Sequence, residues 1–373
     1  RGNSSAVWTG FDVLIWGGHV NEYLPRRGGR YHPANDTWTA MSSGSGPGGS
    51  LYETAVWSGN EMLFAGGRAY DPAADSWRTL STNNAPSPGL NPLAFWIGSR
   101  MIVWGTGQPY SGRSHGGLYD PLRDEWSSLS IAGAPSRSWY ERLTGVWTGS
   151  EMIVWGGSAT GAGGVYQVAS ATWRSVTASG APEISTAATA AVWTGTEMLI
   201  WGTHYEGLGY VRGSRGGRYD PARDRWTAIS TQNAPEPRNG PSAVWTGREM
   251  IVWGGWLYDG NDTGGRYDPK TDTWRPTSLV GVPTRRHQHS AFWTGKEMLI
   301  WGGDRHDEVF DSGGLYDPDT DAWRPTTTDL APTGRFWHAA TWTGDNQATW
   351  DHLDTLSRIR TTAFRTCASY PPN

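Results

Sequence analysis

The chain of 373 residues has a net charge of −4 and one cysteine, Cys367. A mildly acidic chain offers no basic surface to nucleic acid or anionic lipid. One cysteine excludes an intramolecular disulfide framework and a cysteine-rich zinc site. No apolar run reaches the roughly 18 residues of a membrane-spanning helix, so we expect no membrane insertion. The 51 glycines and 25 tryptophans greatly exceed ordinary usage, and their positions reveal a repeat.

Eight units follow one another from the N-terminus, and each begins with a short apolar run that ends in a tryptophan. From the first unit to the last, these tryptophans recur about every 48 residues, which is close to the period of propeller blades. They are Trp8, Trp57, Trp96, Trp147, Trp193, Trp245, Trp293 and Trp342. The spacing therefore favours a ring of small repeated sheets over two or three separate domains.

Each unit contains four segments, which we call A to D. Segment A ends in Trp-Thr-Gly, as at 147–149, and segment B reads Glu-Met-Ile-Val-Trp-Gly-Gly, as at 249–255. Segment C reads Gly-Gly-Arg-Tyr-Asp-Pro, as at 264–269, and segment D begins at a third tryptophan such as Trp274. The segments are rich in β-branched and aromatic residues and are bounded by Gly, Pro or Asp, which predicts strands. Segment B is apolar on both faces, so its strand must be covered on both sides.

The connections between segments carry their own signals. The Gly-x pairs between A and B predict tight hairpins. The Asp-Pro-x-x-Asp pattern between C and D, as at 268–272, predicts a turn rather than a calcium loop, because it supplies too few ligands. Four units depart from the pattern: the second has lost its B–C loop at 66–67, the fourth reads Tyr166-Gln-Val in place of Tyr-Asp-Pro, and the third and fifth read Gly-Thr at 105–106 and 202–203 in place of Gly-Gly.

The order of apolar strand, Gly-Gly, Tyr-Asp-Pro, Trp and Ala-Pro-x-x-Arg over roughly residues 4–345 resembles the kelch repeat. The resemblance implies an all-β, seven-bladed kelch-type β-propeller with four antiparallel strands per blade, A innermost and D outermost. The eighth A segment, 339–343, either closes blade 1 in place of 5–9 or begins a degenerate eighth blade. We expect a propeller over 1–345 and a tail over 346–373 that is irregular or a short helix.

An antiparallel meander places A–B and C–D turns on one rim and B–C loops and D–A connections on the other. Only the second set varies in length and content, and variable loops on a rigid scaffold usually carry binding groups. Aromatic rings there suit stacking on sugars or on a partner's side chains, although they could instead pack over the rim as loop structure. The candidate ligand-binding residues are Trp139, Tyr140, Tyr205, Trp256, Tyr258, Arg285, His306, Trp337 and His338.

The seventh unit has the richest polar cluster. His287 and His289 share one face of a predicted strand, the B–C loop contains Glu308, and Arg335 opens the next A segment. These four residues are the candidate catalytic groups if the innermost strands converge on the axis. Two histidines with carboxylates could bind a divalent metal or perform acid–base chemistry. No spacing here matches a known ligand motif, so a solvated polar loop is the simpler interpretation and the metal stays unknown.

Four arginines follow proline-containing turns just before segment A and resemble the kelch arginine of that position: Arg137, Arg238, Arg285 and Arg335. We expect them to bond the carbonyl groups of adjacent loops. The alternative is a ring of guanidinium groups that receives a carboxylate.

The favoured hypothesis is a non-catalytic scaffold that binds carbohydrate or protein, as a monomer without a cofactor. Tryptophan-rich, lysine-poor repeats resemble kelch proteins of bacterial envelopes and secretions, so we expect a secreted or envelope location, although the chain shows no signal peptide. The alternative is a kelch-type enzyme that acts on a sugar over the central channel near blade 7. Galactose-oxidase-like copper oxidases share the design, but their cofactor needs a Tyr–Cys crosslink, and Cys367 lies outside the repeats. An intracellular adaptor is a third reading, although no partner domain accompanies the repeats.

Overall fold

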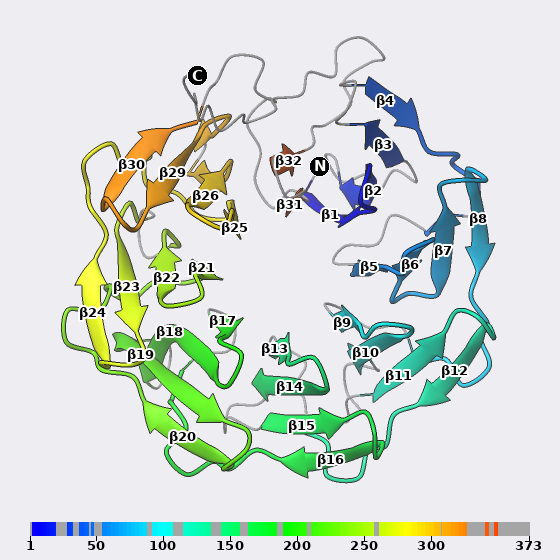
Figure 1. The fold of residues 1–373 in the computed structure, drawn as a ribbon, viewed down its shortest axis with the longest axis horizontal. Coiled ribbons are helices and arrows are strands. Elements are labelled where there is room, and N and C mark those ends of the chain that lie inside the picture. Colours follow the sequence, from blue (N-terminus) through cyan, green and yellow to red (C-terminus); the bar gives the residue numbers. More distant parts are fainter. Residues whose placement is uncertain are drawn as a thin grey trace, which may run out of the picture.

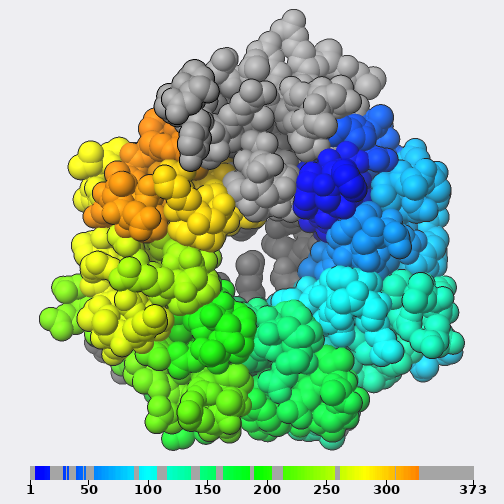
Figure 2. All heavy atoms as spheres, in the orientation of Figure 1, coloured from blue at the N-terminus to red at the C-terminus, as the bar shows by residue number. Residues whose placement is uncertain are grey.

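Seven four-stranded antiparallel sheets are arranged as blades around a central axis (Figure 1). Figure 2 shows the opening at the centre of the ring. The computed structural model describes residues 2–19, 28–32, 37–44, 46–47, 54–87, 92–106, 115–135, 143–156, 163–184, 189–206, 210–256, 261–306, 308–326, 340–342 and 347–349. The predicted all-β, seven-bladed propeller with four antiparallel strands per blade is confirmed.

Each blade contributes one strand to each of four concentric positions, from the axis outward. The innermost strands are β1 (Gly2–Trp8), β5 (Ala55–Trp57), β9 (Leu93–Trp96), β13 (Leu143–Trp147), β17 (Ala190–Trp193), β21 (Ser242–Trp245) and β25 (Ser290–Trp293). The second strands are β2 (Val13–His19), β6 (Met62–Phe64), β10 (Met101–Thr106), β14 (Glu151–Gly156), β18 (Met198–Glu206), β22 (Met250–Trp253) and β26 (Met298–Trp301). These correspond to segments A and B of the repeat.

The two outer positions correspond to segments C and D. The third strands are β3 (Gly28–His32), β7 (Arg68–Asp71), β11 (His115–Asp120), β15 (Gly163–Gln167), β19 (Tyr210–Asp220), β23 (Gly264–Asp268) and β29 (Gly313–Asp317). The outermost strands are β4 (Thr37–Ala40), β8 (Ser76–Thr79), β12 (Glu125–Ser128), β16 (Thr172–Ser175), β20 (Arg225–Ala228), β24 (Thr273–Pro276) and β30 (Ala322–Pro325). In blade 7 a small hairpin of β27 (Asp304–Arg305) and β28 (Glu308–Val309) is inserted between β26 and β29.

The second strand of each blade is buried on both faces, as its unbroken apolar run predicts. In β22 the four side chains from Met250 to Trp253 are each 0% exposed. Met250 and Val252 pack in a cluster with blade 5, whereas Ile251 and Trp253 pack with blade 7. Alternate side chains of one strand therefore fill the two seams beside a blade, which is why the strand cannot be polar on either face.

Most described seams contain a tryptophan pair, one ring from the second strand of a blade and one from the outermost strand of the next. The ring centroids of Trp201 and Trp274 are 4.6 Å apart, and those of Trp253 and Trp323 are 5.4 Å apart. Trp16–Trp77, Trp104–Trp173 and Trp155–Trp226 form the same pair in earlier seams. Such tilted pairs add to the burial energy of the rings, so the tryptophan repeat fixes how neighbouring blades pack.

The turns between third and outermost strands also join neighbouring blades. In blade 5, Oδ1 of Asp224 accepts the hydroxyl of Tyr219 at 2.7 Å and the backbone N–H of Thr177, in blade 4, at 3.1 Å. Aspartates 75, 124, 272 and 321 make the same pair of contacts, one with a tyrosine of their own blade and one with a backbone N–H of the preceding blade. The prediction that the Asp-Pro-x-x-Asp segments form turns is confirmed.

The strand β31 (Ala340–Trp342) lies beside β1 but does not take its place in blade 1. The innermost strand of blade 1 is β1, so residues 340–342 do not replace residues 5–9 and that mode of closure is wrong. Instead β31 (Ala340–Trp342) pairs with β32 (Gln347–Thr349) in a separate sheet that contacts β1. Within the described ranges there is no helix, and hence none that could cross a membrane. Tail residues beyond 349, including Cys367, lie outside them.

Candidate functional site

The B–C loops and D–A connections of blades 6 and 7 are joined to each other through their backbones. Asn239, in the connection into blade 6, exchanges two hydrogen bonds of 2.7 and 2.8 Å with Trp256 of the B–C loop. His287, in the connection into blade 7, exchanges two of 3.1 and 3.0 Å with Asp304. A further bridge joins Asn261 to Arg286. These bonds make the B–C/D–A rim a continuous, ordered surface in this part of the ring.

A buried arginine stands at the same position in both connections. Arg238 and Arg286 are each 1% exposed. Nη1 of Arg286 donates to the carbonyl groups of Gly302 at 2.9 Å and Ser312 at 2.6 Å, and its guanidinium lies 4.2 Å from the centre of the Phe310 ring. Burial lowers the pKa of both arginines to about 10, and the charges of nearby carboxylates offset only part of this effect.

This placement confirms the structural interpretation for Arg238 but corrects the register in blade 7. The arginine that bonds the adjacent loops there is Arg286, and Arg285 beside it is only part-buried. Sequence spacing from the proline could have shown this, since Arg238 and Arg286 both lie three residues after a proline, at Pro235 and Pro283. Arg137 and Arg335 lie outside the described residues.

The two connections can be compared residue by residue from their buried arginines. Asn239 corresponds to His287, Gly240 to Gln288, and Trp256 of one B–C loop to Asp304 of the next. Gly240 has φ of 56° and Gln288 has φ of 57°. Glycine adopts this left-handed conformation freely, whereas a glutamine is strained in it. Blade 7 therefore keeps a glutamine side chain at a position where the backbone favours glycine.

We call Trp256, Asn261, His287, Gln288 and Asp304 the 6–7 rim site. The side chain of Trp256 is 47% exposed, and its ring lies 6.3 Å from that of His287 in an edge-on arrangement. Nδ1 of His287 is 2.9 Å from Oδ1 of Asp304, a contact distance without hydrogen-bond alignment. The site combines one exposed aromatic ring with a buried polar pair beneath it.

Buried polar atoms without a hydrogen-bond partner gather at this site. They are Nδ2 of Asn261 and Oε1 of Gln288, and they accompany the His287–Asp304 pair, whose Nδ1 and Oδ1 atoms face each other. Native proteins satisfy nearly all buried polar atoms, so a group of unpaired ones indicates a place where a ligand's polar groups can bind. Across the described ranges, no three His, Cys, Asp or Glu side chains come together to hold a metal ion.

His289, predicted to share a face and a role with His287, lies deeper in the seam between blades 6 and 7. Its Nε2 is 2.8 Å from Oγ of Ser242, and its ring meets Trp253 edge-on with centroids 5.2 Å apart. Burial, followed by the charges of Arg286 and His287, lowers its pKa to about 3. A histidine that stays neutral in this way packs between blades rather than exchanging protons near neutral pH.

The remaining predicted residues are placed as follows. Glu308 and His306 are exposed in the hairpin insertion of blade 7, with His306 at φ of 50°. The backbone of Tyr205 belongs to β18, and its side chain lies outside what the structure describes. Trp139, Tyr140, Tyr258, Arg335, Trp337 and His338 also lie outside the described residues. The structure thus brings His287 and Trp256 together, whereas His289 packs in the seam against Ser242 and Trp253.

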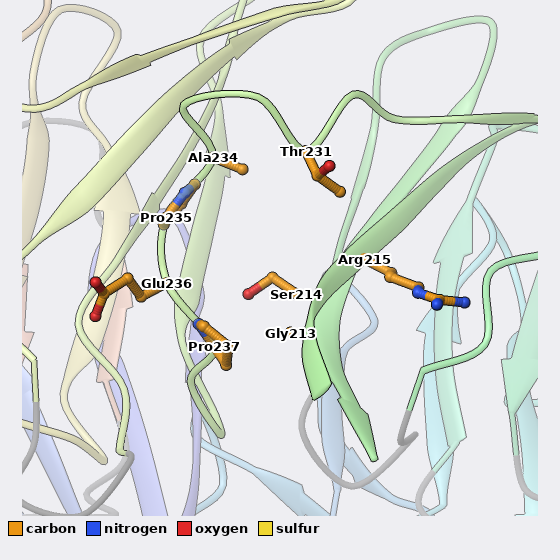
Figure 3. A pocket seen from close by; sticks show the side chains of 8 residues that line it. All are labelled: Gly213, Ser214, Arg215, Thr231, Ala234, Pro235, Glu236 and Pro237. Atoms are coloured by element: carbon orange, nitrogen blue, oxygen red, sulfur yellow. The ribbon is translucent and has the colours of Figure 1, made fainter. Parts of the chain in front are cut away.

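A second feature of the same rim, which the sequence did not single out, is a cavity of about 340 Å³ beside the B–C hairpin of blade 5 (Figure 3). We call it the β19 groove; its lining is Gly213, Ser214, Arg215, Thr231, Ala234, Pro235, Glu236 and Pro237. The hydroxyl of Ser214 is buried and has no hydrogen-bond partner. A sequence signal for it is the long stretch 204–215 between segments B and C of the fifth unit.

The family model described as the KLHDC2/KLHL20/DRC7 Kelch-repeats domain matches residues 143–349. This range covers more than half of the 373 residues and includes blades 4 to 7, the 6–7 rim site and the β19 groove. No curated protein matches the chain.

Proposed function

The chain belongs to the family of KLHDC2/KLHL20/DRC7 kelch-repeat domains, and we propose that it binds a partner protein through the B–C/D–A rim of blades 5 to 7. A kelch-repeat domain is a protein-binding propeller scaffold. Its blades supply a rigid frame, and the loops between them supply the contacts. The choice of this rim rests on the 6–7 rim site, which we take as the centre of the contact.

The exposed ring of Trp256 carries the proposal. An aromatic side chain that is 47% exposed is a candidate anchor for an interface, since tryptophan is enriched among the residues that contribute most to binding. Both backbone hydrogen bonds of Trp256 to Asn239 hold its main chain in place. Binding therefore needs little ordering of this segment, which lowers the entropic cost of association.

The polar atoms beneath the ring supply specificity in this proposal. Asn261 offers N–H donors, Gln288 and Asp304 offer acceptors, and His287 can serve in either role depending on its tautomer. A partner's backbone amides or polar side chains can pair with this mixed set. An incorrect partner, whose polar groups do not match these positions, leaves the buried atoms without hydrogen bonds and therefore binds more weakly.

Carbohydrate is the second candidate ligand, supported by the same arrangement. An apolar sugar face can stack on Trp256 while its hydroxyl groups pair with Asn261, Gln288 and Asp304. Action on such a sugar would need a proton donor and acceptor beside it, and the pair of His287 and Asp304 is the nearest candidate. We rank protein first because the family match favours it.

Site-specific photocrosslinking tests the proposal. A benzophenone amino acid replaces Trp256 in one variant and Phe11 in the control, since Phe11 is 82% exposed in an A–B turn of the opposite rim. We expect the Trp256 position alone to crosslink a discrete protein in extracts of the source cells, identified by mass spectrometry. Identical products from both positions would contradict the proposal. A glycan-array signal lost in Trp256→Ala, without any protein product, would place carbohydrate first.

A further inference from the structure

The β18–β19 hairpin of blade 5 is longer than the strands it belongs with. β18 has 9 residues and β19 has 11, whereas the corresponding strands of blade 6 have 4 and 5. Their pairing continues from Met198 with Tyr219 to Glu206 with Tyr210, past the end of the blade's other strands. The outermost strand β20 pairs with β19 only from Gly217 to Asp220. Beyond that point the outer edge of β19 has no neighbouring strand among the described residues.

The direction of the backbone groups on this edge follows from one hydrogen bond. The N–H of Ile229 donates to the carbonyl of Gly216 at 3.1 Å, so the backbone polar groups of Gly216 face outward. Strand geometry repeats every two residues, so the N–H and carbonyl of Ser214 face the same way. Ser214 pairs across from Thr203, which lies on the inner side. The backbone of Ser214 is therefore directed into the β19 groove.

The wall opposite this edge cannot supply a strand of its own. It consists of the connection through Ala234, Pro235, Glu236 and Pro237, and the two prolines have no N–H to donate. Figure 3 shows the side chain of Ser214 facing this segment. The side chains of Arg215 and Glu236 point away from the groove. Arg215 is already paired with Glu183 at 3.0 Å. The groove thus has an unpaired strand edge on one side and an apolar proline surface on the other.

Resting on the proposed function, we propose that an extended segment of the partner protein docks in the β19 groove as an added strand on β19. Main-chain hydrogen bonds to Ser214 give affinity, the buried Ser214 hydroxyl gains a partner, and an apolar side chain of the segment packs on Pro235 and Pro237. A cavity of about 340 Å³ has the size of a small ligand site and holds a few residues of extended chain. In this proposal, the part of the partner that enters the β19 groove is an extended strand.

The groove is continuous with the 6–7 rim site. Its proline wall leads through Arg238 directly to Asn239, whose backbone pairs with Trp256. Oγ1 of Thr203, in β18, also holds this connection by accepting the N–H of Arg238 at 3.0 Å and donating to its carbonyl at 2.8 Å. One partner can therefore contact the groove and Trp256 together, the first through its backbone and the second through side chains.

The test uses a displayed library of linear 12-residue peptides selected against the full chain, with Kd measured by fluorescence polarisation. Ser214→Pro removes the outward N–H, and the β18 pairing survives because proline is tolerated where the N–H faces away from the sheet. Ser214→Ala is the matched control that keeps the N–H. We expect Ser214→Pro to weaken binding at least tenfold, and Ser214→Ala less than threefold. Equal affinity for the Ser214→Pro variant and the parent chain overturns the strand addition.

A second measurement keeps the test decisive if Ser214→Pro unfolds. Single N-methyl groups are placed along a selected peptide and its Kd is measured on the unaltered chain. We expect alternate positions to lose affinity, because only alternate N–H groups of an added strand face β19. Loss without alternation contradicts the proposal, as does a library without any binder. Peptides weakened by Trp256→Ala but not by Ser214→Pro leave the proposed function standing and remove only the strand addition.

Discussion

The carboxylate of Asp224 in blade 5 accepts the backbone N–H of Thr177 in blade 4 at 3.1 Å. The same oxygen accepts the Tyr219 hydroxyl at 2.7 Å, so one turn residue joins its own blade to the preceding one. Blade 4 breaks this rule, because its equivalent residue is Ala171, held at φ of 55°. Burial alone raises the pKa of Tyr166 in that blade. In blade 5, both burial and Asp224 raise the pKa of Tyr219. The seam between blades 3 and 4 therefore lacks a contact that others have.

Replacing Ala171 by aspartate should restore that contact. We expect Ala171→Asp to raise the free energy of unfolding by about 1–2 kcal/mol, from two hydrogen bonds and from a residue better suited to positive φ. Thermal and urea denaturation measure the change. Ala74→Asp is the control, since it adds the same charge at an exposed turn position of blade 2. An equal effect of both substitutions would mean that net charge, and not the seam, is responsible.

The buried arginines should matter far more than their neighbours. Lysine lacks the planar fork with which Arg286 bonds the carbonyl groups of Gly302 and Ser312. We expect Arg286→Lys to lower the free energy of unfolding by about 2–3 kcal/mol, because at least one buried carbonyl then has no donor. Arg285→Lys, one residue earlier and part-buried, should change it by less than about 0.5 kcal/mol. Equal losses in thermal melts would contradict the register found in blade 7.

His289 should make the chain less stable in acid. Its pKa is lowered from 6.5 in the unfolded chain to about 3 in the fold, chiefly by burial. The unfolded chain therefore takes up this proton first, and stability falls as the pH drops below 6.5 and continues to fall toward 3. His289→Gln, which retains a group that can bond Ser242, should flatten the stability profile between pH 6.5 and 4 by up to about 1 kcal/mol per pH unit. An unchanged slope in the His289→Gln variant would contradict this role of the buried imidazole.

Gln288 provides a test of stored strain. Because its φ of 57° suits glycine, Gln288→Gly should stabilise the chain by about 0.5–1 kcal/mol, and the reciprocal Gly240→Gln should destabilise blade 6 by a similar amount. Circular dichroism melts of the two variants measure both effects. A destabilised Gln288→Gly variant would show that the glutamine side chain contributes structural contacts that outweigh the strain.

The sequence predicted the parts of the fold that repeat locally. Strand order, the double burial of segment B and the turn role of Asp224 each follow from residues within one unit. The mode of closure could not be predicted, because residues 340–342 carry the same pattern as β1, and only their pairing with β32 distinguishes them. The register of Arg286 was predicted one residue too early. The groove beside Ser214 depends on contacts between separate loops, which no local pattern encodes.

The candidate site was predicted in part. Trp256 and His287 were chosen from different segments, and the structure brings their rings to 6.3 Å. Asn261 and Gln288 were missed as members of that site, since their importance lies in buried atoms without partners, and Asp304 was missed because its pairing with His287 joins two separate loops. His289 shares a strand pattern with His287 but lies in the seam, because the left-handed Gln288 between them breaks the regular alternation. The binding roles of these residues remain predictions.

The central claim is that Trp256 anchors a partner protein on the B–C/D–A rim. The most direct measurement uses isothermal titration calorimetry with the purified partner that photocrosslinking identifies. It compares the Kd of this partner for the parent chain, Trp256→Ala and Phe11→Ala. We predict at least a tenfold loss for Trp256→Ala, about 1.4 kcal/mol or more, with unchanged melting temperature, and less than a twofold change for Phe11→Ala. Equal affinity of Trp256→Ala and the parent chain would contradict the account.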